Sequence, residues 1–219
     1  MKRIVIVTCL LFLAGCQAPS EQSLQYQENY EITGKEKEEI LKNTSDSIYI
    51  SINRDNTKAQ EETIDAIYNE GKDVLLPEGR YQITGRLTGN VFIYDEQESL
   101  LFHDLIAPPP LGVESITVDM DGRNILHVDG FEQVNIIPVD TKLSTELTTG
   151  IWEVGKDIKA GTYSVTGNDL GYLEVFEQGA PPRIYEVIGG ESQSETDLEL
   201  KNGQKLRITG LLNVQFERK

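Results

Sequence analysis

The feature that most constrains the fold is a set of short alternating segments that occurs twice along the chain. Residues 79–85 (GRYQITG) are matched by residues 161–167 (GTYSVTG), 82 positions later. The same offset aligns VFIYD with LEVFE, from Val91 and Leu173, and LFHDLI with RIYEVI, from Leu101 and Arg183. Near the C-terminus the offset becomes 80, which places Leu126, Val128, Gly130 and Val134 on Leu206, Ile208, Gly210 and Val214. Several matched blocks in one order predict an internal duplication.

Each copy has the pattern of a β structure. In the second copy, apolar and polar residues alternate over segments that predict the strands 151–154, 162–166, 172–178, 183–188, 197–201, 205–209 and 214–217. Asn202-Gly203 and Asp121-Gly122 separate two such segments and favour tight hairpins, because both residues of each pair tolerate positive φ. Short strands with frequent turns predict two tandem small β-sandwich or barrel-like repeats.

A short α/β lead-in is expected before the repeats. Residues 35–42 (KEKEEILK) are rich in helix formers and predict a helix. Ile48, Ile50 and Ile52 alternate, so residues 47–54 predict a strand. Residues 60–69 favour a helix that ends at Gly71, although the alignment of residues 67–68 with residues 151–152 instead makes this segment the first strand of the first copy. Residues 71–74 (GKDV) align with residues 155–158 (GKDI).

These patterns divide the chain into six parts. The predicted parts are a signal peptide (1–15), a flexible polar tether or stalk (16–33), a helix-strand-helix lead-in (34–70), a first β repeat (71–138), a polar linker (139–149) and a second β repeat (150–219). The fold class is therefore expected to be mainly β.

The amino terminus has the features of an export signal. Lys2 and Arg3 precede an apolar run, residues 4–14, that is too short to span a bilayer. The run ends in LAGC at Cys16, which resembles the lipobox of bacterial lipoproteins. The resemblance implies that Cys16 carries an S-diacylglycerol and an N-acyl chain such as palmitate, after lipoprotein-processing enzymes remove residues 1–15. It also implies a lipid anchor on the extracytoplasmic face of the cell membrane.

Two further resemblances concern the body of the chain. The segment from Gly150 to Tyr163 (GIWEVGKDIKAGTY) resembles a β-domain of secreted and lipid-anchored proteins of Gram-positive bacteria, an uncharacterised family. That resemblance implies an extracellular location and a β fold with no established activity. Residues 74–81 (VLLPEGRY) resemble the opening coil of right-handed β-helix polysaccharide lyases.

Charge and residue types exclude several classes of site. A net charge of −16 argues against nucleic acid as a partner. The only cysteines, Cys9 and Cys16, precede the body of the protein, so no cysteine site is expected there. The two histidines, His103 and His127, lie inside predicted strands, where they face solvent or a local carboxylate. No catalytic triad, metal site or cofactor motif is predicted, and residues 119–124 (DMDGRN) favour a turn over a calcium loop.

Aromatic side chains are the remaining candidates for a site. Tyr172 and Phe176 alternate with Leu173 and Val175 and are therefore expected to point outward, as a candidate platform for a ligand. The sequence thus predicts a lipid-anchored extracytoplasmic protein that acts as a non-enzymatic binding or structural module, with an envelope glycan or surface protein as partner. The alternative is a cell-wall or polysaccharide-active enzyme with a carboxylate site that the sequence does not identify.

Overall fold

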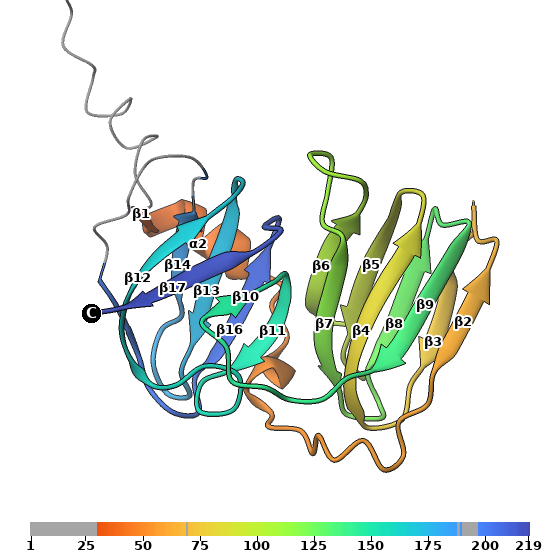
Figure 1. Ribbon diagram of the computed structural model, residues 1–219, viewed down its shortest axis with the longest axis horizontal. Coiled ribbons are helices and arrows are strands. Elements are labelled where there is room, and N and C mark those ends of the chain that lie inside the picture. The colour runs from red at the N-terminus through yellow and green to blue at the C-terminus, as the bar shows by residue number, and fades with distance from the viewer. Residues whose placement is uncertain (1–29, 69, 188, 190–196) are drawn as a thin grey trace, which may run out of the picture.

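The computed structural model describes residues 30–68, 70–187, 189 and 197–219 of the chain. Over these residues the strands form one nine-stranded sheet and two four-stranded sheets. Figure 1 shows two β-sandwiches side by side, with the nine-stranded sheet contributing to both. The expected mainly β class is confirmed. Its physical basis is the alternation in the sequence, which gives each strand one apolar face to bury.

The first sandwich packs the strands β7-β4-β9-β2 of the long sheet against the sheet β3-β8-β5-β6. Its strands are β2 (Glu62–Asp65), β3 (Lys72–Leu75), β4 (Gly79–Arg86), β5 (Gly89–Tyr94), β6 (Leu100–Ile106), β7 (Ser115–Met120), β8 (Ile125–Asp129) and β9 (Gln133–Pro138). Inward residues of both sheets, such as Ile83 and Ile93, are fully buried in one core.

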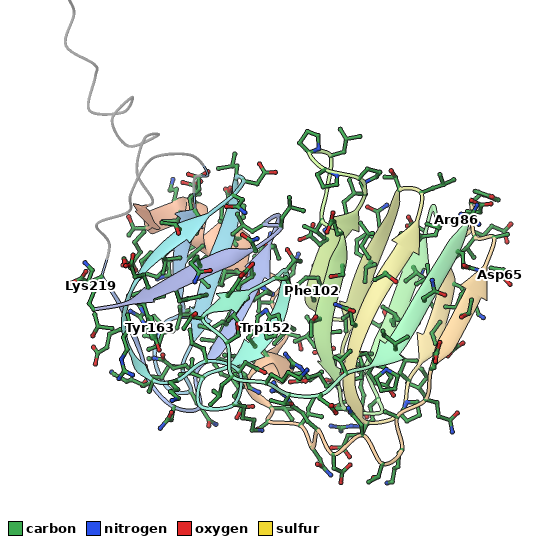
Figure 2. The ribbon with its side chains drawn as sticks, viewed as in Figure 1. Asp65, Arg86, Phe102, Trp152, Tyr163 and Lys219 are labelled. Atoms are coloured by element: carbon green, nitrogen blue, oxygen red, sulfur yellow. The ribbon has the colours of Figure 1, made fainter. Side chains whose placement is uncertain are left out.

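The second sandwich packs β11-β16-β13-β14 of the long sheet, extended by β1, against the sheet β10-β17-β12-β15. Its strands are β1 (Tyr30–Ile32), β10 (Glu146–Leu147), β11 (Gly150–Glu153), β12 (Gly161–Gly167), β13 (Gly171–Phe176), β14 (Arg183–Val187), β15 (Leu198–Leu200), β16 (Lys205–Thr209) and β17 (Val214–Arg218). Asp65 of the first sandwich and Lys219, which follows β17, lie at opposite ends of the molecule (Figure 2).

A single parallel contact joins the two sandwiches into one sheet. Gly150 of β11 pairs with Thr117 of β7, and the Thr117 N–H donates to the Thr149 carbonyl at 3.1 Å. A Cβ atom on Gly150 would lie 2.0 Å from the Thr117 carbonyl oxygen, and the φ of Gly150 is 148°. Glycine is required here because any side chain would separate the two strands.

The two sandwiches have the same strand pairing. In the first, β4 pairs with β7 and β9, and β5 pairs with β6 and β8; in the second, β12 pairs with β15 and β17, and β13 pairs with β14 and β16. The Tyr81 hydroxyl donates to the carbonyl four residues before it, at Pro77, and the Tyr163 hydroxyl does the same to Lys159. Duplication of one unit is our interpretation of this shared pairing.

Three of the sequence alignments differ from the structure. Residues 151–152 lie in β11, whereas the aligned residues 67–68 follow β2 and lie in no strand. His103 faces Phe92, whereas Ile184 faces Glu174, so His103 corresponds to Ile184 and the offset there is one residue smaller than predicted. Strand β3 pairs with β8, with Lys72 facing Val128, and β11 pairs in the same way with β16. The strand equivalent to β3 is therefore β11. The aligned GKD segments are therefore not equivalent: residues 72–74 lie in β3, whereas residues 155–157 form a turn after β11.

The lead-in runs from the second sandwich to the first. The helix α2 (Gly34–Leu41) confirms the prediction for residues 35–42. It lies on the second sandwich, and the chain then runs from between the sandwiches below the first sandwich to β2 (Figure 1). The predicted strand at residues 47–54 is wrong: a 3-10 helix, η1 (Asp46–Tyr49), is followed by extended chain without a strand partner. Ile48 and Ile52 are buried but Ile50 between them is 41% exposed, so the three alternating residues do not share one buried face.

The predicted helix at residues 60–69 is also wrong. Residues 62–65 form β2, which pairs with β9 and buries Ile64. The segment therefore contains a first strand, as the alternative held, but not at residues 67–68, where the alignment placed it. Pairing with β9 at the sheet edge provides hydrogen bonds for the backbone N–H and C=O groups of this segment, and this outweighs its weak helical preference. Gly71 has a positive φ of 66° in the turn before β3 rather than at the end of a helix.

The predicted turns form, but they are not hairpins. Gly122 and Gly203 have φ values of 83° and 86°. Each turn joins strands of opposite sheets, β7 to β8 and β15 to β16, so the chain arches across the core. The Asp121 carboxylate accepts the N–H groups of Arg123 and Asn124 at 2.8 and 2.9 Å, as expected for a turn residue.

The predicted boundaries are wrong where short strands complete the sheet edges. Residues 30–32 of the predicted tether form β1, residues 62–65 of the lead-in form β2, and residues 146–147 of the linker form β10. The resemblance to a β-helix is wrong as well, because β3 and β4 both pair antiparallel with their neighbours. The predicted signal peptide and Cys16 lie outside the described residues.

Among the helices of the described ranges, none has the length and apolar character needed to span a membrane.

Candidate functional site

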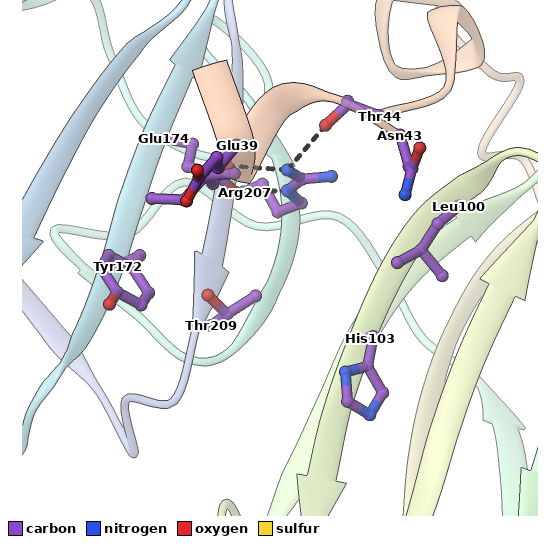
Figure 3. Close-up of a pocket in the computed structure, with 10 residues that line it drawn as sticks. Glu39, Asn43, Thr44, Leu100, His103, Tyr172, Glu174, Arg207 and Thr209 are labelled. Carbon is purple, nitrogen blue, oxygen red and sulfur yellow. Dashed lines mark hydrogen bonds and ion pairs between the residues drawn. The ribbon is translucent and has the colours of Figure 1, made fainter. Parts of the chain in front are cut away.

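A cavity of about 250 Å³ lies where the two sandwiches meet the lead-in (Figure 3). Strand β6 supplies one wall, β13 and β16 supply the opposite wall, and α2 with the turn after it closes one side. The lining residues are Glu39, Ile40, Asn43, Thr44, Leu100, His103, Tyr172, Glu174, Arg207 and Thr209. Because three separate segments contribute, the cavity depends on the whole fold.

A buried ion pair forms the base of the cavity. The Arg207 Nη2 donates to Glu174 Oε1 at 2.7 Å, and its Nε donates to the other carboxylate oxygen. The same guanidinium donates to the Leu101 carbonyl at 3.0 Å and to the Thr44 hydroxyl at 3.2 Å. It also lies 5.2 Å from the centre of the Phe176 ring. Arg207 is therefore fully engaged, and its charge is neutralised by Glu174.

Two ring side chains line the walls. His103 projects from β6 and stacks on Phe92, with 4.2 Å between ring centroids and 10° between planes. Tyr172 projects from β13 on the other wall (Figure 3). Burial raises the pKa of the Tyr172 hydroxyl, and the negative charges of Glu186 and Glu36 raise it further. The hydroxyl is thus held in its protonated form, in which it can donate a hydrogen bond.

Contacts beside the cavity hold its parts together. The Asp104 carboxylate of β6 accepts the N–H of Gly210, after β16, at 2.6 Å. Burial raises the pKa of Asp104, although this hydrogen bond opposes the increase. In the lead-in, the Ser45 hydroxyl donates to the Asp95 carboxylate and the Ser45 N–H to the Leu100 carbonyl. Burial acts to raise the pKa of Asp95, but the hydrogen bonds from Ser45 and two backbone N–H groups outweigh it, and the pKa is lowered.

A second group of charges is buried at the junction. The Arg54 guanidinium donates to Asp119 at 2.6 and 3.0 Å and to both Asp157 oxygens at 2.9 Å, while Arg80 donates to Asp119 at 2.9 Å. Arg80 also lies 4.7 Å from the centre of the Trp152 ring. The group joins the lead-in, β4, β7 and the turn after β11. Because its charges pair with one another, with Arg80 Nη2 lying 3.2 Å from Asp157 Oδ1, the group links these segments through ion pairs.

The two predicted aromatic site residues and the two histidines lie in different surroundings in the structure. Tyr172 lines the cavity, but Phe176 is 1% exposed and packs edge-on against Tyr49, so the predicted pair of outward aromatics is wrong. Both point to the outer face of the sheet as alternation required, but the lead-in covers Phe176. His127 donates to or accepts from Asp73 at 2.6 Å, the local carboxylate expected for it. His103 lines the cavity, a role that sequence reasoning did not predict.

The buried pair of Glu174 and Arg207 also escaped the sequence analysis. Both alternate with apolar neighbours, which is the pattern of a solvated strand face. The lead-in and β6 of the first sandwich cover and bury them. In residues 30–68, 70–187, 189 and 197–219, no three His, Cys, Asp or Glu side chains gather as a metal site would require.

No family model, curated protein or solved structure matches the chain.

Proposed function

We propose that the chain is a lipid-anchored, extracytoplasmic protein that acts as a non-enzymatic binding module at the cell envelope. The LAGC sequence at Cys16 supports the anchor and the location. The cavity between the sandwiches supports binding, because rings and polar groups from opposite walls converge on one space.

The charges of the cavity favour a neutral or cationic polar ligand. Glu174 and Arg207 neutralise each other, and Glu39 has no cationic partner within the described part of the chain. Glu186 and Glu36 add negative charge near Tyr172. An anion would therefore be repelled, whereas the hydroxyls of Tyr172 and Thr209 and the amide of Asn43 can bond to a polyol.

The size of the cavity sets the scale of the ligand. A volume of about 250 Å³ is near the lower end of small-molecule sites, which span roughly 300–1,000 Å³. One sugar unit of an envelope glycan fits this scale and would contact the rings of His103 and Tyr172. The observation that carries this proposal is the pair of ring side chains on facing walls of a cavity whose described lining residues include no unpaired Lys or Arg.

A glycan array and a cell-wall pull-down with the full chain test the proposal. Binding to an uncharged or amino-sugar glycan is expected, and Tyr172→Ala should weaken it at least about fivefold, since a sugar-ring contact and a hydrogen bond are lost. Tyr68→Ala, an exposed tyrosine outside the cavity, is the matched control and should bind normally. Release of soluble product from the wall polymer would instead support the polysaccharide-active enzyme, and retention by no glycan or wall fraction would refute the binding role.

The anchor is tested separately. The Cys16→Ala variant should incorporate no fatty-acid probe and should leave the membrane fraction, because it lacks the thiol that accepts the lipid. Labelling of that variant to the level of the natural chain would contradict the proposed anchor and leave the cavity unaffected.

A further inference from the structure

A second cavity, of about 610 Å³, lies at the end of the second sandwich near the C-terminus. Its lining combines the segment before β10, the loop between β11 and β12, and the last strand, through Leu143, Ser144, Thr145, Lys159, Tyr163 and Arg218. Tyr163 and Arg218 face each other on neighbouring strands, β12 and β17. The volume falls within the range of ligand sites, roughly 300–1,000 Å³.

The charge of this cavity is opposite to that of the protein as a whole. The chain has a net charge of −16, yet Lys159 and Arg218 both line this space. Neither cation has a carboxylate within ion-pair distance among the residues that the structure places, whereas the buried Arg54, Arg207 and Lys205 are all paired. Among the residues that the structure describes, no acidic side chain lines the cavity. Two cations without partners therefore produce a local positive potential that an anion would neutralise.

Local contacts fix the backbone that carries the two cations, whose side chains are exposed. The buried Tyr163 hydroxyl donates to the Lys159 carbonyl at 2.7 Å, which fixes the backbone that carries the lysine. A Cβ atom on Gly161 would lie at ordinary contact distance, 3.4 Å, from the Arg218 Nε, so the Arg218 side chain lies against the start of β12. Leu143, 54% exposed, adds an apolar surface at the edge of the cavity.

We propose that this cavity binds an organic anion through a phosphate or carboxylate group. The planar guanidinium of Arg218 can bond to two oxygens of such a group, and the ammonium of Lys159 adds a point charge. The apolar edge at Leu143 contacts the rest of the ligand. This site is distinct from the cavity of the proposed function, which favours neutral or cationic ligands, and it does not depend on that function.

Binding of defined anions to the full chain tests the proposal. Inorganic phosphate, citrate and a glycerol-phosphate polymer are titrated separately and followed by calorimetry and, for phosphate, by the width of its phosphorus resonance. At least one of these probes is expected to bind, with an affinity that falls as salt is raised, because the attraction is electrostatic. If the polymer binds more tightly than phosphate, the anionic group belongs to an envelope polymer. If the two bind equally, the ligand is a free small anion.

Charge-matched variants locate the site. Arg218→Gln and Lys159→Gln should each weaken binding at least about tenfold, as expected for loss of a charge-assisted hydrogen bond. Arg123→Gln removes the same charge from an exposed arginine that is already paired with Asp121, and it should bind the probes as the natural chain does. Both cavity residues are exposed, so the variants should retain the natural melting temperature. The proposal would be overturned if none of the probes bound, or if Arg123→Gln weakened binding as much as the cavity variants. Neither result would affect glycan binding at the first cavity.

Discussion

Removing the Asp157 carboxylate tests whether buried charges hold the two sandwiches together. Asp157 is fully buried, and its oxygens accept both hydrogen bonds from Arg54 Nη1 and one from the Glu153 N–H at 2.7 Å. Arg80 Nη2 also lies 3.2 Å from Oδ1. In Asp157→Ala, two buried guanidinium groups would share the single carboxylate of Asp119.

The expected loss of stability follows from this arrangement. Breaking a buried ion pair on one side costs about 3–5 kcal/mol, because a charge stays buried without its partner. For a chain of this size each kcal/mol corresponds to about 2–4 °C in melting temperature, so a decrease of about 6–20 °C is expected. Glu132→Ala removes a carboxylate from the exposed pair with Arg86 and should change stability by less than about 1 kcal/mol.

Thermal and urea unfolding of the full chain, measured at one pH and salt concentration, provide the comparison. Asp157→Asn separates shape from charge: it retains the volume of the side chain and should still lose most of the stability. If the free energy of unfolding of Asp157→Ala lies within about 1 kcal/mol of that of the natural chain, the Asp157 carboxylate does not compensate the burial of the two arginines. That result would refute the reasoning.

Two further predictions concern the junction and pH. Gly150→Ala should destabilise the chain by about 1–3 kcal/mol more than Gly203→Ala, because only at Gly150 would the new Cβ meet backbone, 2.0 Å from the Thr117 oxygen. Both positions have positive φ, so equal melting temperatures for the two variants would contradict the requirement for close approach. The pKa of Asp95 is lower in the folded chain than its ordinary value, so its ionised form contributes stability above about pH 4, and this contribution is lost as the pH falls through the folded pKa. Asp95→Asn should therefore be less stable than the natural chain at pH 7 and lose less further stability on acidification to about pH 3; parallel pH profiles for the two chains would refute this assignment.

Most strands of the second sandwich could be predicted closely from the sequence. Alternation sets which residues face the core, and this local property produced the bounds of strands such as β16 (Lys205–Thr209). The short edge strands were missed for the opposite reason. Residues 30–32 and 146–147 have little pattern of their own and become strands by pairing with β14 and β17.

The candidate site, too, could be predicted from the sequence only in part. Alternation correctly directed Tyr172 and Phe176 to the outer face of the sheet, but it could not indicate that the lead-in covers Phe176 and leaves Tyr172 beside a cavity. The place of His103 opposite Tyr172 depends on how two sandwiches meet, and no local pattern contains that information.

Equivalent strand positions in the two sandwiches show the difference between local pattern and tertiary contact. Phe92 and His127 pair across β5 and β8, and Glu174 and Arg207 pair across β13 and β16. The first pair is partly exposed, whereas the second is buried beneath residues 34–49 and forms the base of the cavity. The sequence by itself determined the longer strands, their inward faces and the positions of the two turns, because these depend on neighbouring residues and on side-chain periodicity. Only the tertiary structure decided which outer face is covered, since that depends on contacts between segments more than a hundred residues apart.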